Sequence, residues 1–302
     1  MREFKSGYVA LLGKPNVGKS TLLNCFVQEP LAIISPKPQT TRDVIFGIRT
    51  DDSAQVIFVD TPGLHLPKHA LGEQMVTSAR QAGSDADIVL AVVDAEAGIR
   101  SEDKAVLDFL RQRGHSPRVW TAVLINKIDR VSPDTVALVR EVCRKRVPDI
   151  AVFAVSARNA ENIDAVLAEI RAHLPEGPLY YPADQLTDRH QRFIAAEFIR
   201  EQVLLHCQEE VPHAVAVVVE EFKENPGRKI VIGATIYVER ESQKRIVIGA
   251  GGAMLKTIGT ASRHRMEQFL GQGVFLQLWV KVRERWRKDD FFLRQLGYCP
   301  KN

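Results

Sequence analysis

The stretch Gly13-Lys14-Pro15-Asn16-Val17-Gly18-Lys19-Ser20 decides the fold of the first half of this chain. It satisfies the pattern Gly-x-x-x-x-Gly-Lys-Ser, in which glycines let successive backbone N–H groups point inward and cradle phosphates. We expect Lys19 to reach the terminal phosphates and the Ser20 hydroxyl to bind Mg²⁺. The apolar residues 8–12 before the loop predict a buried strand, and residues 20–26, which include Thr21, predict the start of a helix. A helix N-terminus aimed at the phosphates adds a favourable dipole.

A second motif, Asn126-Lys127-Ile128-Asp129, follows the apolar run 119–125 and specifies the base. The run predicts a buried parallel strand that delivers these side chains to its carboxyl end, where open α/β sheets bind ligands. The Asp129 carboxylate can accept hydrogen bonds from N1–H and the exocyclic amino group of guanine. Adenine would leave Asp129 desolvated and unpaired, which costs about 1–3 kcal/mol. The Lys127 stem can lie along the base, and Asn126 can tie this loop to the phosphate loop.

Two further segments supply candidates for the metal and the γ-phosphate. The apolar strand 55–59 runs into Asp60-Thr61-Pro62-Gly63, in which Asp60 fits the Mg²⁺ shell through water and the Gly63 N–H fits γ-phosphate sensing. Residues 36–42 are polar and interrupted by proline, so we expect them to be irregular. One threonine of this stretch should complete the Mg²⁺ shell; we favour Thr41, with Thr40 as the alternative. The catalytic candidates are Asn16, Lys19, Thr41 and Gly63.

A weaker motif completes the nucleotide site. Ser156-Ala157-Arg158 follows another strand-like run, residues 152–155, so the Ala157 N–H could meet the guanine O6. A serine after a strand is more often a helix N-cap, and the motif gains weight only from its place after the others.

These segments, in this order, resemble the GTPase domain of the Ras-like superfamily, and residues 37–42 resemble its Era branch. The chain departs from the Ras pattern at Leu64, where Ras-type enzymes carry a glutamine that orients the attacking water. Leucine cannot polarise water, so hydrolysis must use another group or be slow, on the order of 10⁻⁴ s⁻¹. Related enzymes with this substitution use a K⁺ ion held partly by an asparagine of the phosphate loop. The resemblance therefore implies potassium stimulation through Asn16.

Composition is typical of a globular protein with two domains. The chain has 302 residues, of which 45% are hydrophobic and 26% charged. No apolar run approaches the ~18 residues that would span a bilayer, and no apolar signal region precedes the first strand. Cys25, Cys143, Cys207 and Cys299 lack any metal or redox spacing, which fits a reducing cytosol. We therefore predict a cytoplasmic protein without a transmembrane segment.

Strand-like and helix-like runs alternate from Tyr8 to Leu174, which predicts an α/β domain with a mostly parallel sheet and helices on both faces. The stretch 174–182 contains three prolines and a glycine and cannot continue a helix. We therefore predict a GTPase domain over residues 1–174, a linker over 175–187 and a second domain over 188–302.

The second domain has an α+β pattern. Thr187 is a candidate N-cap for a helix over 188–207, which precedes strands over 213–224 and 229–239 joined by a turn at 225–227. Two helices then flank Gly249-Ala250-Gly251-Gly252, the second ending near Leu270, and a strand covers 274–282. The predicted order is helix-strand-strand-helix-helix-strand.

The loop Gly249–Gly252 resembles the Gly-x-x-Gly loop of a KH module, and the order of elements indicates the type II form. Glycines let two helix ends approach a nucleic-acid backbone closely, and their N–H groups favour phosphate oxygens. The adjoining apolar groove would take about four unpaired bases. Its expected walls are Ile246, Ile248, Leu255 and Ile258, and its expected cations are Lys244, Arg245, Lys256, Arg263 and Arg265. Ala250 and Gly251 are neutral where KH loops are often basic, which predicts a small salt dependence.

Charge is unevenly distributed along the chain. Residues 1–185 carry 22 Lys and Arg against 23 Asp and Glu, whereas residues 186–302 carry 19 against 14. The excess hints at a polyanionic partner for the second half. The cationic run 281–288 is equally consistent with an extension of an RNA surface and with a solvated strand edge.

A GTPase domain followed by one type II KH domain resembles the Era family over nearly the whole chain. The resemblance implies a monomer that binds single-stranded RNA near the 3′ end of 16S ribosomal RNA and acts in assembly of the 30S subunit. The residues themselves support a Mg²⁺-dependent GTP switch joined to a domain that binds single-stranded RNA. Two alternatives are a GTPase that drives tRNA modification and a regulator whose basic half contacts an anionic membrane peripherally.

Overall fold

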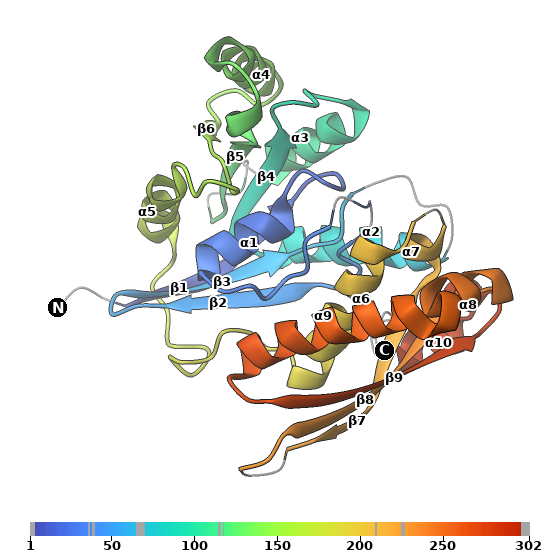
Figure 1. Ribbon diagram of the computed structural model, residues 1–302. Helices are drawn as coiled ribbons and strands as arrows, with labels where there is room; N and C mark the ends of the chain where they lie inside the picture. The colour runs from blue at the N-terminus through green and yellow to red at the C-terminus, as the bar shows by residue number, and fades with distance from the viewer. Residues whose placement is uncertain are drawn as a thin grey trace. The chain divides into compact units, whose positions relative to one another are not determined.

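The computed structural model describes residues 4–35, 37, 40–64, 70–113, 116, 118–208, 210–224 and 227–296. The chain divides into two compact units, one holding most of the chain up to Asp188 and the other beginning at Arg189 (Figure 1). The second unit also takes in Ile33–Thr40 and the start of α2 (Ala70–Asp85). Cys299, the middle of the predicted 36–42 segment and the predicted turn at residues 225–226 lie outside the described residues.

Within its described residues, the first unit contains a six-stranded sheet in the order β2-β3-β1-β4-β5-β6. β2 is antiparallel to β3 and the other pairs are parallel. The strands are β1 (Lys5–Leu12), β2 (Ile45–Thr50), β3 (Ala54–Asp60), β4 (Ile88–Asp94), β5 (Trp120–Asn126) and β6 (Ala151–Ala154). Every residue of β3 and β4 is buried, because helices cover both faces of the sheet.

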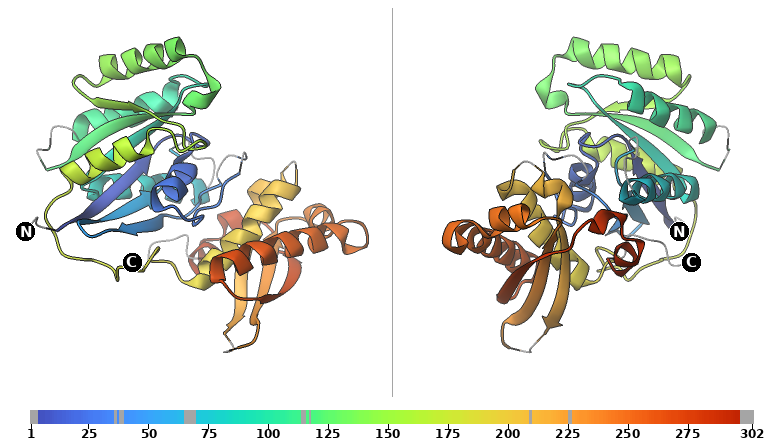
Figure 2. Two further views of the ribbon diagram at one scale, coloured as in Figure 1. Left: turned by 60° about the vertical axis from the view of Figure 1, so that its left-hand side comes forward. Right: turned by 90° about the vertical axis from the view of Figure 1, so that its right-hand side faces the viewer.

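The helices of this unit lie on the two faces of the sheet (Figure 1, Figure 2). α1 (Lys19–Val27) and α5 (Ile163–His173) contact each other on one face, and α2, α3 (Ser101–Arg113) and α4 (Pro133–Arg146) cover the other. Since parallel strands end at the same edge of a sheet, the segments after β1, β3, β4, β5 and β6 meet there. These segments contain the motifs identified in the sequence.

The proline-containing stretch 175–187 is fastened to the first unit along its length. The Ser6 N–H donates to Pro175 O over 3.1 Å, and the Ile48 N–H donates to Leu186 O over 2.8 Å. Between them, the Gln55 side chain accepts from the N–H groups of Tyr180 and Tyr181 and donates to Tyr181 O. The predicted linker is therefore attached to the sheet rather than a free tether.

Within its described residues, the second unit contains a three-stranded sheet in the order β7-β8-β9. β7 (Ala216–Lys223) is antiparallel to β8 (Ile230–Val238), and β9 (Val274–Val282) is parallel to β8. The helices are α6 (Gln191–His206), α7 (Val211–Ala214), α8 (Glu241–Ile248), α9 (Ala253–Leu270) and α10 (Asp290–Gln295). α6, α8 and α9 pack with one face of the sheet around buried Phe198, Ile232 and Ile258.

Two boundaries of this unit differ from the sequence prediction. The first helix begins at Gln191 rather than Asp188, because its N-cap, His190, has an extended backbone. Residues 211–214, whose later part was predicted as strand, form the short helix α7, with Pro212 in its first turn. Proline suits that position because the first N–H groups of a helix have no intrahelical partner.

The segment Ile33–Thr40 packs within the second unit against α6. Ile33 is buried in the core, and Glu201 Oε1 accepts from the Ile34 N–H over 3.1 Å. Arg200, only 1% exposed, donates to Thr40 O over 2.5 Å and to both oxygens of Glu197. Two charged side chains of α6 therefore hold the backbone of this segment.

Candidate functional site

The phosphate loop connects β1 to α1 and depends on glycine at two points. Gly18 is the N-cap of α1 with a φ of 98°, and a Cβ there would lie 2.3 Å from Asn126 Nδ2. A Cβ on Gly13 would lie 2.5 Å from Val92 O. Only glycine therefore fits at both ends of the loop.

Lys19 lies across this loop. The side chain is buried, and its Nζ donates to Gly13 O over 3.1 Å and to Lys14 O over 3.0 Å. Burial lowers the pKa of Lys19 to about 8, against the opposing effect of the Asp60 carboxylate. A phosphate group would replace the two carbonyl oxygens with a full negative charge and favour the protonated lysine.

Three oxygen-bearing side chains meet beside Lys19. Ser20 Oγ donates to Asp60 Oδ2 over 2.7 Å and lies 2.8 Å from Thr41 Oγ1, which is itself 3.3 Å from Asp60 Oδ2. Asp60 is fully buried; burial raises its pKa, and Lys19, Ser20 and Thr41 oppose that rise. Asp60 Oδ1 has no hydrogen-bond partner among the described residues.

These hydroxyl and carboxylate oxygens suit Mg²⁺, which prefers hard ligands and keeps several waters. The described residues contain no cluster of three or more His, Cys, Asp or Glu that could hold a metal, and two of the three oxygen-bearing side chains gathered here carry hydroxyl groups. Thr40 Oγ1 donates instead to Lys37 O over 2.6 Å. The geometry therefore favours Thr41 over Thr40.

The segment after β3 approaches the phosphate loop closely. A Cβ on Gly63 would lie 2.6 Å from Pro15 N, so glycine is required at this point. Thr61 Oγ1 donates to Leu11 O over 2.7 Å, and the Leu64 N–H donates to Gly13 O over 3.0 Å. The Leu64 side chain packs against the core beneath α3 and α4 and brings no polar group toward a water.

The segment after β5 is tied to the phosphate loop as the sequence suggested. Buried Asn126 donates from Nδ2 to Val17 O over 2.9 Å. The Ala157 N–H, expected to face the base, donates to Asn126 Oδ1 over 3.0 Å. Ser156 Oγ donates to Asp129 Oδ1 over 2.6 Å, which fixes the orientation of an exposed carboxylate.

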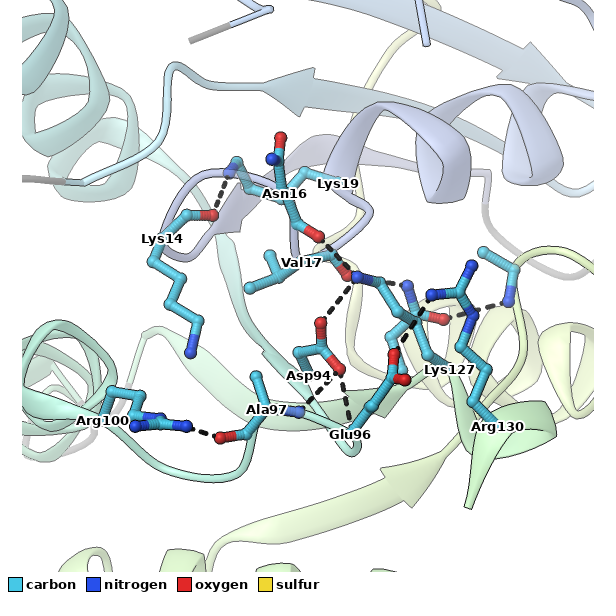
Figure 3. Close-up of polar contacts among 12 residues, drawn as sticks. Lys14, Asn16, Val17, Lys19, Asp94, Glu96, Ala97, Arg100, Lys127 and Arg130 are labelled. Carbon is cyan, nitrogen blue, oxygen red and sulfur yellow. Dashed lines mark hydrogen bonds and ion pairs between the residues drawn. The ribbon is translucent and has the colours of Figure 1, made fainter. Parts of the chain in front are cut away.

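Figure 3 shows Lys127 reaching between the phosphate loop and the end of β4. Its Nζ donates to Asn16 O over 2.7 Å and to Asp94 Oδ2 over 2.6 Å. Sequence reasoning did not single out Asp94, nor Asp103, whose Oδ2 lies 2.7 Å from Lys14 Nζ. A carboxylate at the end of an all-apolar run, the same pattern that drew attention to Asp60, was the available signal for Asp94.

In the second unit, the loop between α8 and α9 is built from glycines with positive φ. A Cβ on Gly249, φ 73°, would lie 2.7 Å from the Met254 Cβ, so this glycine serves close packing. Gly251, φ 58°, and Gly252, φ 83°, have nothing within 4 Å of such a Cβ. Space beside these two glycines is therefore open to a ligand.

One of the four residues predicted to line the groove is inaccessible. Ile246 is 38% exposed, Ile248 and Leu255 are half-buried, and Ile258 is completely buried in the core and cannot line a groove. Lys244, Arg245 and Lys256 have no ion-pair partner in the described part of the chain. Arg263 pairs with Glu267, and Arg265 with Glu201 over the Phe198 ring.

The cationic run 281–288 is partly used inside the fold. Arg283 pairs with Asp289 over 2.7 Å, and Arg287 pairs with Glu239. Trp286 between them is completely buried, and its Nε1 donates to Ala214 O over 2.8 Å. These contacts favour a structural role for Arg283 and Arg287.

Comparison with known proteins agrees with both units. A sequence model described as 50S ribosome-binding GTPase matches residues 8–127, and a KH domain model matches residues 210–287. The curated GTPase Era of Caldicellulosiruptor saccharolyticus is 46% identical over 297 residues, which cover 98% of each chain. The chain belongs to the Era family of GTPases.

Two solved Era structures share the fold, each with a TM-score of 0.93, 39% identity and coverage of 98% of this chain and 100% of the other. One is a tyrosine-to-alanine variant from Aquifex aeolicus bound to GDP and AlF4⁻. The other is a complex of Era with MgGDPNP and nucleotides 1506–1542 of 16S ribosomal RNA. The Era-family architecture of a P-loop GTPase and a KH domain thus accounts for both units. No helix within the described residues is long and apolar enough to cross a bilayer.

Proposed function

We propose that this Era-family GTPase is a GTP-operated switch that binds single-stranded RNA at the 3′ end of 16S ribosomal RNA during assembly of the 30S subunit. The observation that carries the proposal is the presence in one chain of a guanine-type nucleotide site and an open glycine loop with unpaired cations. The solved Era complex with MgGDPNP and 16S nucleotides, similar over 98% of this chain, supports both halves.

In the nucleotide site, the backbone N–H groups of the phosphate loop and Lys19 hold the phosphates, and Asp129, oriented by Ser156, reads the guanine. Ser20 and Thr41 would bind Mg²⁺ directly and Asp60 through water, as the partnerless Asp60 Oδ1 suggests. The metal supplies charge neutralisation for the phosphate oxygens when bound. The Gly63 N–H would meet the γ-phosphate.

Hydrolysis is expected to be slow without an activator, because Leu64 offers no polar group and its side chain packs into the core. Asn16 has an unusual left-handed backbone, φ 65°, at the position from which a K⁺ ligand is inferred. Turnover should therefore rise when Na⁺ is replaced by K⁺ at constant ionic strength. Equal rates in the two salts would eliminate the potassium hypothesis and leave the GTPase assignment intact.

Nucleotide state and RNA binding can be coupled through the chain itself. Thr40 belongs to the second unit, where Arg200 holds its carbonyl, and the next residue, Thr41, lies beside Ser20 at the candidate metal site. Loss of the γ-phosphate would release Thr41 and alter the segment held by α6.

The test is binding of a single-stranded RNA with the sequence of the 16S 3′ end, in the presence of GTP analogue, GDP or no nucleotide. The wild-type protein should bind, with an affinity that depends on the nucleotide. The Gly251→Asp/Gly252→Asp variant should lose binding, because two carboxylates would face the phosphates.

RNA binding that changes neither with the nucleotide nor with the two substitutions would contradict the proposal. Co-sedimentation with anionic vesicles, with and without RNA competitor, would then test the membrane alternative. The similarities found for this chain favour neither that alternative nor a role in tRNA modification.

A further inference from the structure

Two carboxylates, one at the end of β4 and one in the first turn of α3, bond to lysines at the phosphate loop: Asp94 to Lys127, which contacts the loop, and Asp103 to Lys14, which belongs to it. Asp94, the last residue of β4, is 7% exposed; its Oδ1 accepts from the N–H groups of Glu96 and Ala97, and its Oδ2 accepts from Lys127 Nζ. The same Lys127 Nζ also donates to Asn16 O of the phosphate loop (Figure 3). Asp94 thus connects the turn after β4 to the phosphate loop.

Asp103 reaches the same loop from the first turn of α3. It is completely buried, and its Oδ2 accepts from both the Arg100 N–H over 2.8 Å and Lys14 Nζ over 2.7 Å. Its Oδ1 has no partner in the described part of the chain. The Lys14 side chain is itself only 14% exposed, so this ion pair is largely shielded from solvent.

The residues restrained in this way, Lys14 and Asn16, flank Pro15 at the corner of the phosphate loop. Asn16 has a φ of 65°, in the left-handed region, which asparagine adopts at a lower cost than most residues with a side chain. Pro15 is also the contact point for Gly63. The loop therefore turns sharply at a corner that Gly63 also approaches, and the two lysine–carboxylate pairs restrain this corner from outside the loop.

We propose that Asp94 and Asp103 are positioning residues for the phosphate loop, Asp94 acting through Lys127 and Asp103 acting through Lys14. The inference rests on the proposed nucleotide site. It assigns to the β4–α3 connection the task of keeping the Lys14–Asn16 corner in its binding conformation before the nucleotide arrives. It also gives Lys14 a role as an anchor of the loop rather than a phosphate ligand.

The test is a double-mutant cycle of Lys14→Met, Asp103→Asn and the double variant in the full-length chain with Mg²⁺. Two readouts are needed: the rate at which fluorescent methylanthraniloyl-GDP is chased off by unlabelled GDP, and the melting temperature without nucleotide. Each single variant leaves a shielded charge without its partner, so both should melt at lower temperature and release the nucleotide about tenfold faster.

The double variant separates positioning from a purely structural role. With no charge left uncompensated, its melting temperature should return toward that of the wild type. Nucleotide release should stay about tenfold fast, because the anchor is missing. If release and melting temperature recover together, Asp103 only stabilises the fold and the inference is overturned.

Asp108→Asn provides the matched control on the same helix, since Asp108 pairs with Arg146 at the surface, away from the loop. It should leave nucleotide release unchanged.

Asp94→Asn should accelerate release as Asp103→Asn does; wild-type release in Asp94→Asn would overturn the role of Asp94. If Asp103→Asn does not fold, the release rate of the double variant alone tests the inference: fast release supports it and wild-type release overturns it. A wild-type protein that fails to bind methylanthraniloyl-GDP would refute the proposed nucleotide site itself.

Discussion

The candidate nucleotide site and the glycine loop of this Era-family GTPase, both proposed to bind phosphates, are built in opposite ways. In the first unit, Lys19, Asp60 and Asn126 are buried and already bonded to other protein groups. In the second unit, Gly251 is exposed and nearby Lys256 has no ion-pair partner among the described residues. The groups proposed to hold the phosphates and the metal are therefore part of the interior, whereas the proposed RNA surface consists of exposed groups. Substitutions in the first should alter stability and binding together, and those in the second should alter binding alone.

The largest expected effect is at Asp129. Asp129→Asn replaces an acceptor for two guanine donors by an amide, and GTP affinity should fall by on the order of 10³-fold or more. Xanthosine triphosphate, which has a carbonyl in place of the exocyclic amino group, should bind this variant better than GTP does. Competition binding with the two nucleotides checks both statements, and unchanged preference for GTP would show that Asp129 does not read the base.

The next effect sharpens the contrast between the two regions. Gly251→Asp/Gly252→Asp should lower RNA affinity about 100-fold, yet leave GTP affinity without RNA within a factor of about two, because nothing lies within 4 Å of either new Cβ and the strain of side chains at these positive φ values stays within the loop. RNA titrations and nucleotide titrations of the same preparation provide the comparison. A parallel loss of GTP affinity would mean that the loop supports the fold.

Lys19 gives a pH effect of intermediate size. Without nucleotide its pKa is lowered to about 8 by burial, so the side chain loses its proton as the pH rises above 8. Bound phosphates favour the protonated form and raise the pKa again, so GTP binding should take up a proton and weaken by up to about tenfold per pH unit above 8. Calorimetry in buffers of different ionisation enthalpy measures that uptake. Lys19→Arg is the control, because arginine keeps its proton and should show none.

The smallest effects concern single cations of the RNA surface. Lys256→Ala should weaken RNA binding a few-fold and reduce the slope of log affinity against log salt by about 0.7, the value for one phosphate contact on a single strand. Arg263→Ala should do less, since Arg263 is engaged by Glu267. Equal changes in the two variants would contradict the distinction between unpaired and paired cations.

The nucleotide-site candidates could be found from the sequence because each lies at or just after the carboxyl end of an apolar strand at one edge of the sheet. Gly13 follows β1, and Asp60 and Asn126 are the last residues of β3 and β5. The fixed spacing of the phosphate loop reflects backbone geometry that few sequences can satisfy. In the second unit, periodicity predicted the order of the elements and the loop Gly249–Gly252 indicated the KH module, whereas the Era resemblance added the RNA target.

What the sequence did not reveal depends on long-range contacts. The bonds of Asp94 and Asp103 to the lysines near the phosphate loop, and that of Ser156 to Asp129, join residues 27 to 89 positions apart. Ile258 was placed in the groove because periodicity alone does not tell which face of a helix enters the core. The start of α6 was placed three residues early because Thr187 resembles an N-cap, although the backbone at His190 is still extended.

The most direct test of the account is the affinity for GTP analogue and for GDP, measured with and without the 16S 3′-end RNA. If nucleotide and RNA are coupled, RNA must change the ratio of the two nucleotide affinities by the same factor by which the nucleotides change RNA affinity. We predict that RNA shifts this ratio by at least about fivefold and that Gly251→Asp/Gly252→Asp abolishes the shift. An unchanged ratio in the presence of saturating RNA would contradict the claim that this protein is a GTP switch acting on RNA.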